Sequence, residues 1–113
     1  MIVLSLLLNV AVLVPVTYGM ATGADWADSA YGPDSPARGI VLAVYLAILV
    51  ASIGFLFRPV PEMVAVLLAV QIVYKLITPI SVGTLGNPVV AANLGIAAFH
   101  ALTLSLILYR ANA

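Results

Sequence analysis

Apolar residues form four long stretches along the chain, and most polar residues lie in the short segments between them. The stretches are Ile2–Met20, Gly39–Phe57, Met63–Ile77 and Val89–Tyr109. A helix rises about 1.5 Å per residue and the hydrocarbon core of a bilayer is roughly 30 Å thick, so one span needs about 20 residues. We therefore predict four transmembrane helices in a protein that works inside or against a bilayer.

The connecting segments place the ends of the predicted helices. Pro36 after Asp34 or Ser35, and Pro88 after Asn87, are typical of a capped helix start. Thr78-Pro79 predicts the end of the third span, because a residue before proline is biased away from helical geometry. The predicted fold is an all-α integral membrane protein, with four helices packed as two antiparallel hairpins in a single domain of residues 1–113. The predicted spans are residues 2–20, 36–57, 61–78 and 88–109, with an acidic and aromatic loop at 21–35.

The first span resembles a signal peptide in one respect, since small residues follow its apolar run near Gly19 and Gly23. It has no basic segment before the apolar run, which signal peptides normally carry. We therefore expect it to be a true span, in which Asn9 hydrogen-bonds to a neighbouring helix.

Composition excludes several classes of function. Charged residues make up 7% of the chain, whereas soluble domains carry about a quarter. The net charge is zero and no basic patch exists, so we expect no nucleic-acid partner. The chain has no cysteine, which excludes disulfides, thiolate catalysis and cysteine-ligated metal centres.

The basic residues predict an orientation. With four spans, Arg58 and Arg110 lie on one side of the membrane and Arg38 on the other. The positive-inside rule then places both termini in the cytoplasm, and we expect a plasma membrane or bacterial inner membrane location.

Small residues recur every four positions along the second span, at Gly39, Ala43, Ala47 and Ala51. This spacing lets helix backbones approach closely, so it predicts a helix–helix interface. The partner is either another span of the chain or another subunit. Trp26 and Tyr31 in the preceding loop are expected to be interfacial anchors, because their rings suit the headgroup level.

Polar residues inside the third and fourth spans form a predicted intramembrane cluster. Lys75 either snorkels to the headgroups or faces the bundle and pairs with another group. Helical spacing puts Gln71, Lys75 and Thr78 on one face, while Asn93 and His100 share a face of the next helix. The predicted cluster consists of Gln71, Tyr74, Lys75, Asn93 and His100.

His100 is the chain's one histidine. It either hydrogen-bonds across helices, relays protons, or serves as a single axial ligand to a haem or a chlorin. All four acidic residues lie in loops or at a span end, so no catalytic set or metal site converges and we do not expect an enzyme.

Three functions stay open at this point. The first is a non-catalytic membrane subunit that packs through small-residue helix faces against copies of itself or into a larger complex. The second is a small oligomeric transporter or channel with a polar site between spans three and four. The third is an enzyme or cofactor carrier using His100. Four spans in so short a chain superficially resemble small multidrug transporters, but the membrane-embedded glutamate expected in their first helix is absent, and the first span offers Asn9.

Overall fold

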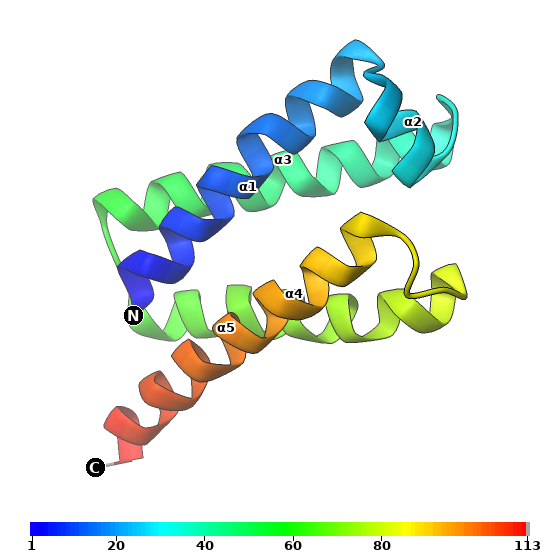
Figure 1. Cartoon of the computed structure of the whole chain (residues 1–113). Helices are drawn as coiled ribbons and strands as arrows, with labels where there is room; N and C mark the ends of the chain where they lie inside the picture. The colour runs from blue at the N-terminus through cyan, green and yellow to red at the C-terminus, as the bar shows by residue number, and fades with distance from the viewer. Residues whose placement is uncertain (113) are drawn as a thin grey trace. The chain divides into compact units, whose positions relative to one another are not determined.

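The computed structural model describes residues 1–112, and their regular structure is helical throughout. The helices are α1 (Ile2–Thr22), α2 (Asp25–Tyr31), α3 (Pro36–Phe57), α4 (Pro61–Val82) and α5 (Pro88–Asn112) (Figure 1). Among the described residues, four helices are long and apolar enough to cross a membrane: α1, α3, α4 and α5 up to Arg110. The predicted all-α membrane fold is confirmed.

The chain forms two compact units. One consists of Met1–Ser5 together with the chain from Pro59 onward, and the other of Leu6–Arg58. The two units are described separately below. The prediction of a single domain holding all four spans stays a prediction.

In the Leu6–Arg58 unit, α1 and α3 are connected through the short helix α2. The predicted cap of α3 is confirmed at Ser35, whose hydroxyl accepts a hydrogen bond of 3.1 Å from the Arg38 amide, with Pro36 at the first helical position. Side chains buried on α3 follow the helical repeat, at Arg38, Tyr45, Ile48 and Ser52. The opposite face of α3 remains exposed.

The predicted loop at 21–35 contains a helix that the sequence pattern did not indicate. α1 continues to Thr22, and Gly23, at φ 71°, lies between it and α2. Asp25 and Asp28 lie in the first turn of α2, where negative charge is favoured by the helix dipole. Gly32, at φ 82°, ends α2. Asp25 and Asp28, whose charge is typical of a solvated loop, therefore stabilise the start of a short helix.

In the unit formed by Met1–Ser5 and the chain from Pro59 onward, α4 and α5 run antiparallel and pack along one another (Figure 1). The side chain of Asn87 accepts a hydrogen bond of 2.9 Å from the Val89 amide, which confirms the predicted start of α5 at Pro88. The core between α4 and α5 contains Val64 and Leu68 of α4, and Val90 and Ala97 of α5.

The predicted end of the third span at residue 78 is wrong. α4 passes through Pro79 and ends at Val82. Proline removes one backbone N–H but does not end a membrane helix when its neighbours tolerate the change. The helix stops at Gly83, which adopts the left-handed conformation at φ 85° and donates its amide to the Pro79 carbonyl at 3.0 Å.

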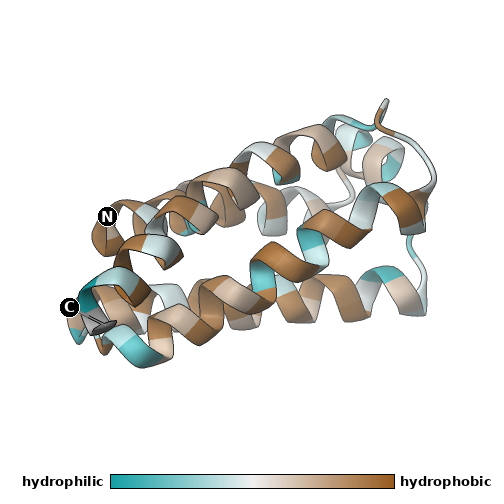
Figure 2. Ribbon diagram, turned by 90° about the horizontal axis from the view of Figure 1, so that it is seen from below, coloured by the Kyte–Doolittle hydropathy of each residue, from teal (hydrophilic) through white to brown (hydrophobic). Residues whose placement is uncertain are grey.

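Figure 2 shows that hydrophobic residues predominate along the long helices. Many of the large apolar side chains on these helices are exposed. Phe57 is 85% exposed, Ile80 82% and Val50 69%. A soluble protein does not expose apolar surface of this extent without a partner. Together with the lengths of the four helices, this surface indicates contact with lipid.

Candidate functional site

The candidate site is a set of buried polar side chains on α4 and α5. On α4, Gln71 and Lys75 continue the buried stripe that begins with Val64 and Leu68. On α5, the polar residues Asn93, His100 and Thr103 share a buried stripe with Val90 and Ala97. Each stripe follows the three- and four-residue repeat of a helix, so the same periodicity that buries the apolar core also buries these polar groups.

Lys75 does not snorkel to the membrane surface. Its side chain is buried, and its ammonium lies 3.2 Å from Oε1 of Gln71, one turn nearer the N-terminal end of α4. The nearer end of the helix is Val82, about 10 Å away in the opposite direction. The ring of Tyr74 lies 5.6 Å from the ammonium and adds a cation–π contact.

Gln71 is held so that its oxygen faces Lys75. Its Nε2 atom donates to the Leu67 carbonyl at 3.4 Å, which leaves Oε1 to accept from the ammonium. No carboxylate joins this pair, because the ion pair found in the described part of the chain is that of Arg38 with Asp28. Among the described residues, the buried ammonium is therefore held by an amide oxygen and an aromatic ring.

His100 is fully buried, and neither of its ring nitrogens has a hydrogen-bond partner among residues 1–112. The Ser5 backbone lies beside the ring without reaching hydrogen-bond geometry, and the Lys75 charge is close enough to act on it. A buried polar atom without a partner costs about 1–3 kcal/mol. The His100 ring is thus a fully buried polar group of the cluster with no hydrogen-bond partner among the described residues.

The structure places the predicted cluster residues as follows. Lys75 contacts both Gln71 and Tyr74, and His100 lies within electrostatic range of Lys75. Asn93 is buried and lies on the same stripe of α5 as His100. Its side chain forms no hydrogen bond within the described residues. A functional role for this set stays a prediction, as does ligation of a haem or chlorin by His100. Among the described residues, no group of three His, Cys, Asp or Glu is placed to hold a metal ion.

Ser5 and Thr103 belong to the same buried polar region and were not predicted. Their hydroxyl oxygens lie 2.7 Å apart and share a hydrogen bond. Thr103 also lies within 3.3 Å of the Phe99 carbonyl and is one turn from His100. The spacing of Thr103 from His100 is the sequence signal for its burial, whereas nothing local in the sequence indicates Ser5 as its partner.

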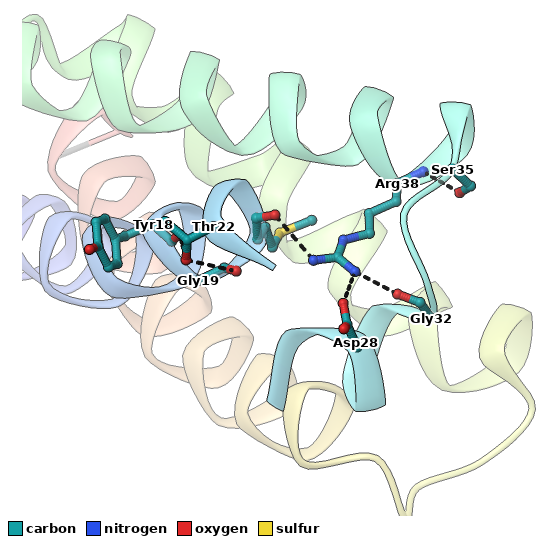
Figure 3. A network of polar contacts seen from close by, with 8 residues as sticks. Tyr18, Gly19, Thr22, Asp28, Gly32, Ser35 and Arg38 are labelled. Carbon is teal, nitrogen blue, oxygen red and sulfur yellow. Dashed lines mark hydrogen bonds and ion pairs between the residues drawn. The ribbon is translucent and has the colours of Figure 1, made fainter. Parts of the chain in front are cut away.

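A second polar network surrounds Arg38 in the Leu6–Arg58 unit (Figure 3). The guanidinium donates to Asp28, to the Gly32 carbonyl at 2.7 Å and to the Met20 carbonyl at 3.1 Å. Its side chain is 4% exposed, against 50% for that of Asp28. The network links the end of α1, Asp28 of α2, Gly32 after α2 and the start of α3. No local sequence pattern predicts this network, because the acceptors lie 6 to 18 residues from Arg38.

The predicted small-residue stripe lies on the open face of α3. Gly39, Ala43 and Ala47 are exposed and Ala51 is half-buried. A Cβ atom added at Gly39 would meet nothing within 4 Å. The stripe is therefore available to a second helix, and its packing role stays a prediction.

The two predicted anchors have contacts within their own unit. Trp26 is 45% exposed, and its ring lies so close to Gly19 that a Cβ atom there would approach Cζ2 to 2.1 Å. Tyr31 packs edge-on against Tyr45 at 5.9 Å between ring centroids, and its hydroxyl donates to that of Tyr45 at 3.3 Å. An interfacial position for these rings stays a prediction.

Comparison of this chain with protein-family models, with curated proteins and with solved structures finds no match in any of the three.

Proposed function

We propose that the chain is a non-catalytic integral membrane subunit that associates through the small-residue face of α3. The open stripe of Gly39, Ala43, Ala47 and Ala51 is the observation that carries this proposal. Membrane helices associate through close backbone approach, because lipid offers no hydrophobic drive between them. The partner helix belongs to another copy of the chain or to a larger membrane complex.

The absence of cysteine from the chain makes this proposal directly testable. A cysteine introduced as Ala43→Cys would react with a membrane-permeant maleimide slowly in native membranes and quickly after dispersal in detergent. Ala98→Cys is the matched control, because Ala98 is also exposed but lies on α5. Equal protection of both cysteines, or protection of neither, would refute the subunit proposal. Disulfide-linked dimers of the Ala43→Cys protein would identify another copy as the partner.

A second candidate function is a small transporter or channel, formed as an oligomer around the α4–α5 polar cluster. The specific observation in its favour is the buried Lys75 ammonium, for which the described residues provide no acid. Ionisable residues inside membranes are costly and often mark a pathway for ions or substrates. If Lys75→Met abolishes anion flux in proteoliposomes while the protein stays folded, the transport function is supported; unchanged flux, or no flux in the unaltered protein, rejects it.

We further propose a plasma or bacterial inner membrane location with both termini in the cytoplasm. Arg58 and Arg110 lie at the same end of their spans by the order of the helices, opposite Arg38. A fusion of alkaline phosphatase to the C-terminal end of the chain should be inactive in this orientation. An active fusion would place the C-terminal end on the opposite side of the membrane and refute the proposed orientation.

A further inference from the structure

A cavity of about 580 Å³ lies where α1 and α4 begin and α5 ends. All of its lining residues belong to the unit formed by Met1–Ser5 and the chain from Pro59 onward. Its walls are mostly apolar, and Thr103 lies at the level farthest from the ends of the helices. A volume between roughly 300 and 1,000 Å³ is typical of sites that hold small organic molecules.

Two side chains of opposite charge line this cavity without pairing. Glu62 lies in the first turn of α4 and Arg110 in the last turn of α5. Both side chains are exposed, and neither has a hydrogen bond or an ion pair among residues 1–112. The cavity therefore offers one free carboxylate and one free guanidinium at the ends of adjacent spans.

The lining residues reach from the helix ends into the hydrocarbon. Thr103 and Arg110 are seven residues apart on α5, which corresponds to about 10 Å along the helix axis. The wall between these levels is formed by Leu106 and Ile107, with Ala65 on α4 and Ile2 on α1. Such a cavity suits an occupant that is apolar in its inner part and carries both a positive and a negative group at its outer end.

We propose that this cavity binds one phospholipid whose headgroup carries a phosphate and a primary ammonium, as in phosphatidylethanolamine. Arg110 pairs with the phosphate, since a guanidinium matches two phosphate oxygens in a fork geometry. Glu62 accepts hydrogen bonds from the ammonium, and part of one acyl chain lies against Ala65 and Ile107. This site does not depend on the α3 stripe, so either proposal can fail alone.

The charges select this headgroup over other lipids. A phosphatidylglycerol headgroup would satisfy Arg110, but it offers Glu62 only neutral hydroxyl donors next to an anionic phosphate and no positive charge. A choline headgroup carries the positive charge but has no N–H to donate to Glu62. Water fits the cavity poorly, because buried water needs two to four polar partners and the inner walls are apolar.

The test uses the full chain in liposomes of equimolar phosphatidylethanolamine and phosphatidylglycerol. After extraction in mild detergent, native mass spectrometry counts the lipids retained per chain. We expect about one phosphatidylethanolamine, roughly tenfold preferred over phosphatidylglycerol, the factor that corresponds to one charge-assisted hydrogen bond. In Glu62→Gln the two lipids should be retained about equally. In Arg110→Gln retention of both should fall about tenfold, while the matched change Arg58→Gln, outside the cavity, should have no effect.

A second variant tests the apolar part of the site. Ala65→Phe fills the cavity and should displace the lipid, whereas Ala98→Phe adds the same ring to an exposed position of α5 and should not. Circular dichroism confirms that each variant keeps its helices. The proposal is overturned if the unaltered chain retains no phosphatidylethanolamine, if the lipid ratio is unchanged in Glu62→Gln, or if Arg110→Gln and a folded Ala65→Phe retain lipid as the unaltered chain does.

Discussion

Nδ2 of Asn9 donates a hydrogen bond of 3.0 Å to Oγ of Ser52, which joins α1 to α3 across 43 residues of sequence. Asn9 is 2% exposed and Ser52 is fully buried. Both belong to the Leu6–Arg58 unit, so the contact is internal to one compact part of the molecule. It confirms that Asn9 bonds to a neighbouring helix, as its position in an apolar span predicts.

The Asn9–Ser52 contact should make a modest contribution to stability. Hydrogen bonds between membrane helices average about 0.6 kcal/mol in double-mutant cycles, with a maximum near 1.7 kcal/mol. We expect Asn9→Ala and Ser52→Ala to be coupled by about 0.5–1.5 kcal/mol in the free energy of unfolding. Denaturation by sodium dodecyl sulfate in mixed micelles, followed by circular dichroism, measures it. A coupling of zero would mean that the hydrogen bond adds no stability, and Ser105→Ala, at an exposed serine of α5, is the control.

Arg38 should contribute more to the free energy of unfolding than any exposed arginine. Its guanidinium is buried and satisfies the carbonyls of Met20 and Gly32 as well as Asp28. Arg38→Met removes the partner of all three groups, and we expect a loss of about 3 kcal/mol in the free energy of unfolding. Asp28→Asn should cost less, because the Asp28 side chain is half exposed and water replaces its partner.

Arg58→Met is the matched control for Arg38→Met. Arg58 is exposed, and its change should shift the unfolding free energy by less than about 0.5 kcal/mol. Equal effects of the two changes would show that the Arg38 network does not stabilise the fold.

Gly19 should be intolerant of a side chain while Trp26 is present. A Cβ atom at Gly19 would lie 2.1 Å from Cζ2 and 2.7 Å from Cε2 of the Trp26 ring. The ring must leave its place in Gly19→Ala, and because Trp26 is the chain's one tryptophan, its fluorescence should shift to longer wavelength. Gly95→Ala is the control, since a Cβ atom at Gly95 meets nothing within 4 Å. An unshifted emission maximum in Gly19→Ala would contradict the contact.

Lys75 should destabilise the fold that contains it. Its ammonium is buried beside Gln71 and Tyr74 and has no acid in the described chain. Methionine has a similar unbranched stem without the charge, and we expect Lys75→Met to raise the free energy of unfolding by about 1 kcal/mol or more. The same detergent denaturation measures it. A fall instead of a rise would give Lys75 a structural role and remove the argument that it is kept for function.

Patterns local in the chain account for what was predicted correctly from the sequence. Apolar length identified the four long helices, and the pairs Ser35-Pro36 and Asn87-Pro88 marked two helix starts because capping is a local property. The burial of Gln71, Lys75, Asn93 and His100 also follows from local spacing on α4 and α5. These features depend on residues within one or two turns of each other.

The missed features depend on distant residues or on competition between local signals. Pro79 suggested a helix end, but the left-handed Gly83 set it four residues later. Three acceptors for Arg38 lie 6 to 18 residues away, at the end of α1, in α2 and directly after α2, so no single helical repeat brings them together. The hydrogen bond of Ser5 with Thr103 joins residues 98 positions apart, beyond any local pattern.

The Ser5–Thr103 hydrogen bond has a consequence for the order of events during biosynthesis. At about 5–20 residues per second, a ribosome needs roughly 5–20 s to add the residues that separate the two partners. The Asn9–Ser52 hydrogen bond and the Arg38 network can both form in that time, because all of their residues lie within the first 58. The Leu6–Arg58 unit thus has time to assemble before α5, which carries the hydrogen-bond partner of Ser5, has been synthesised.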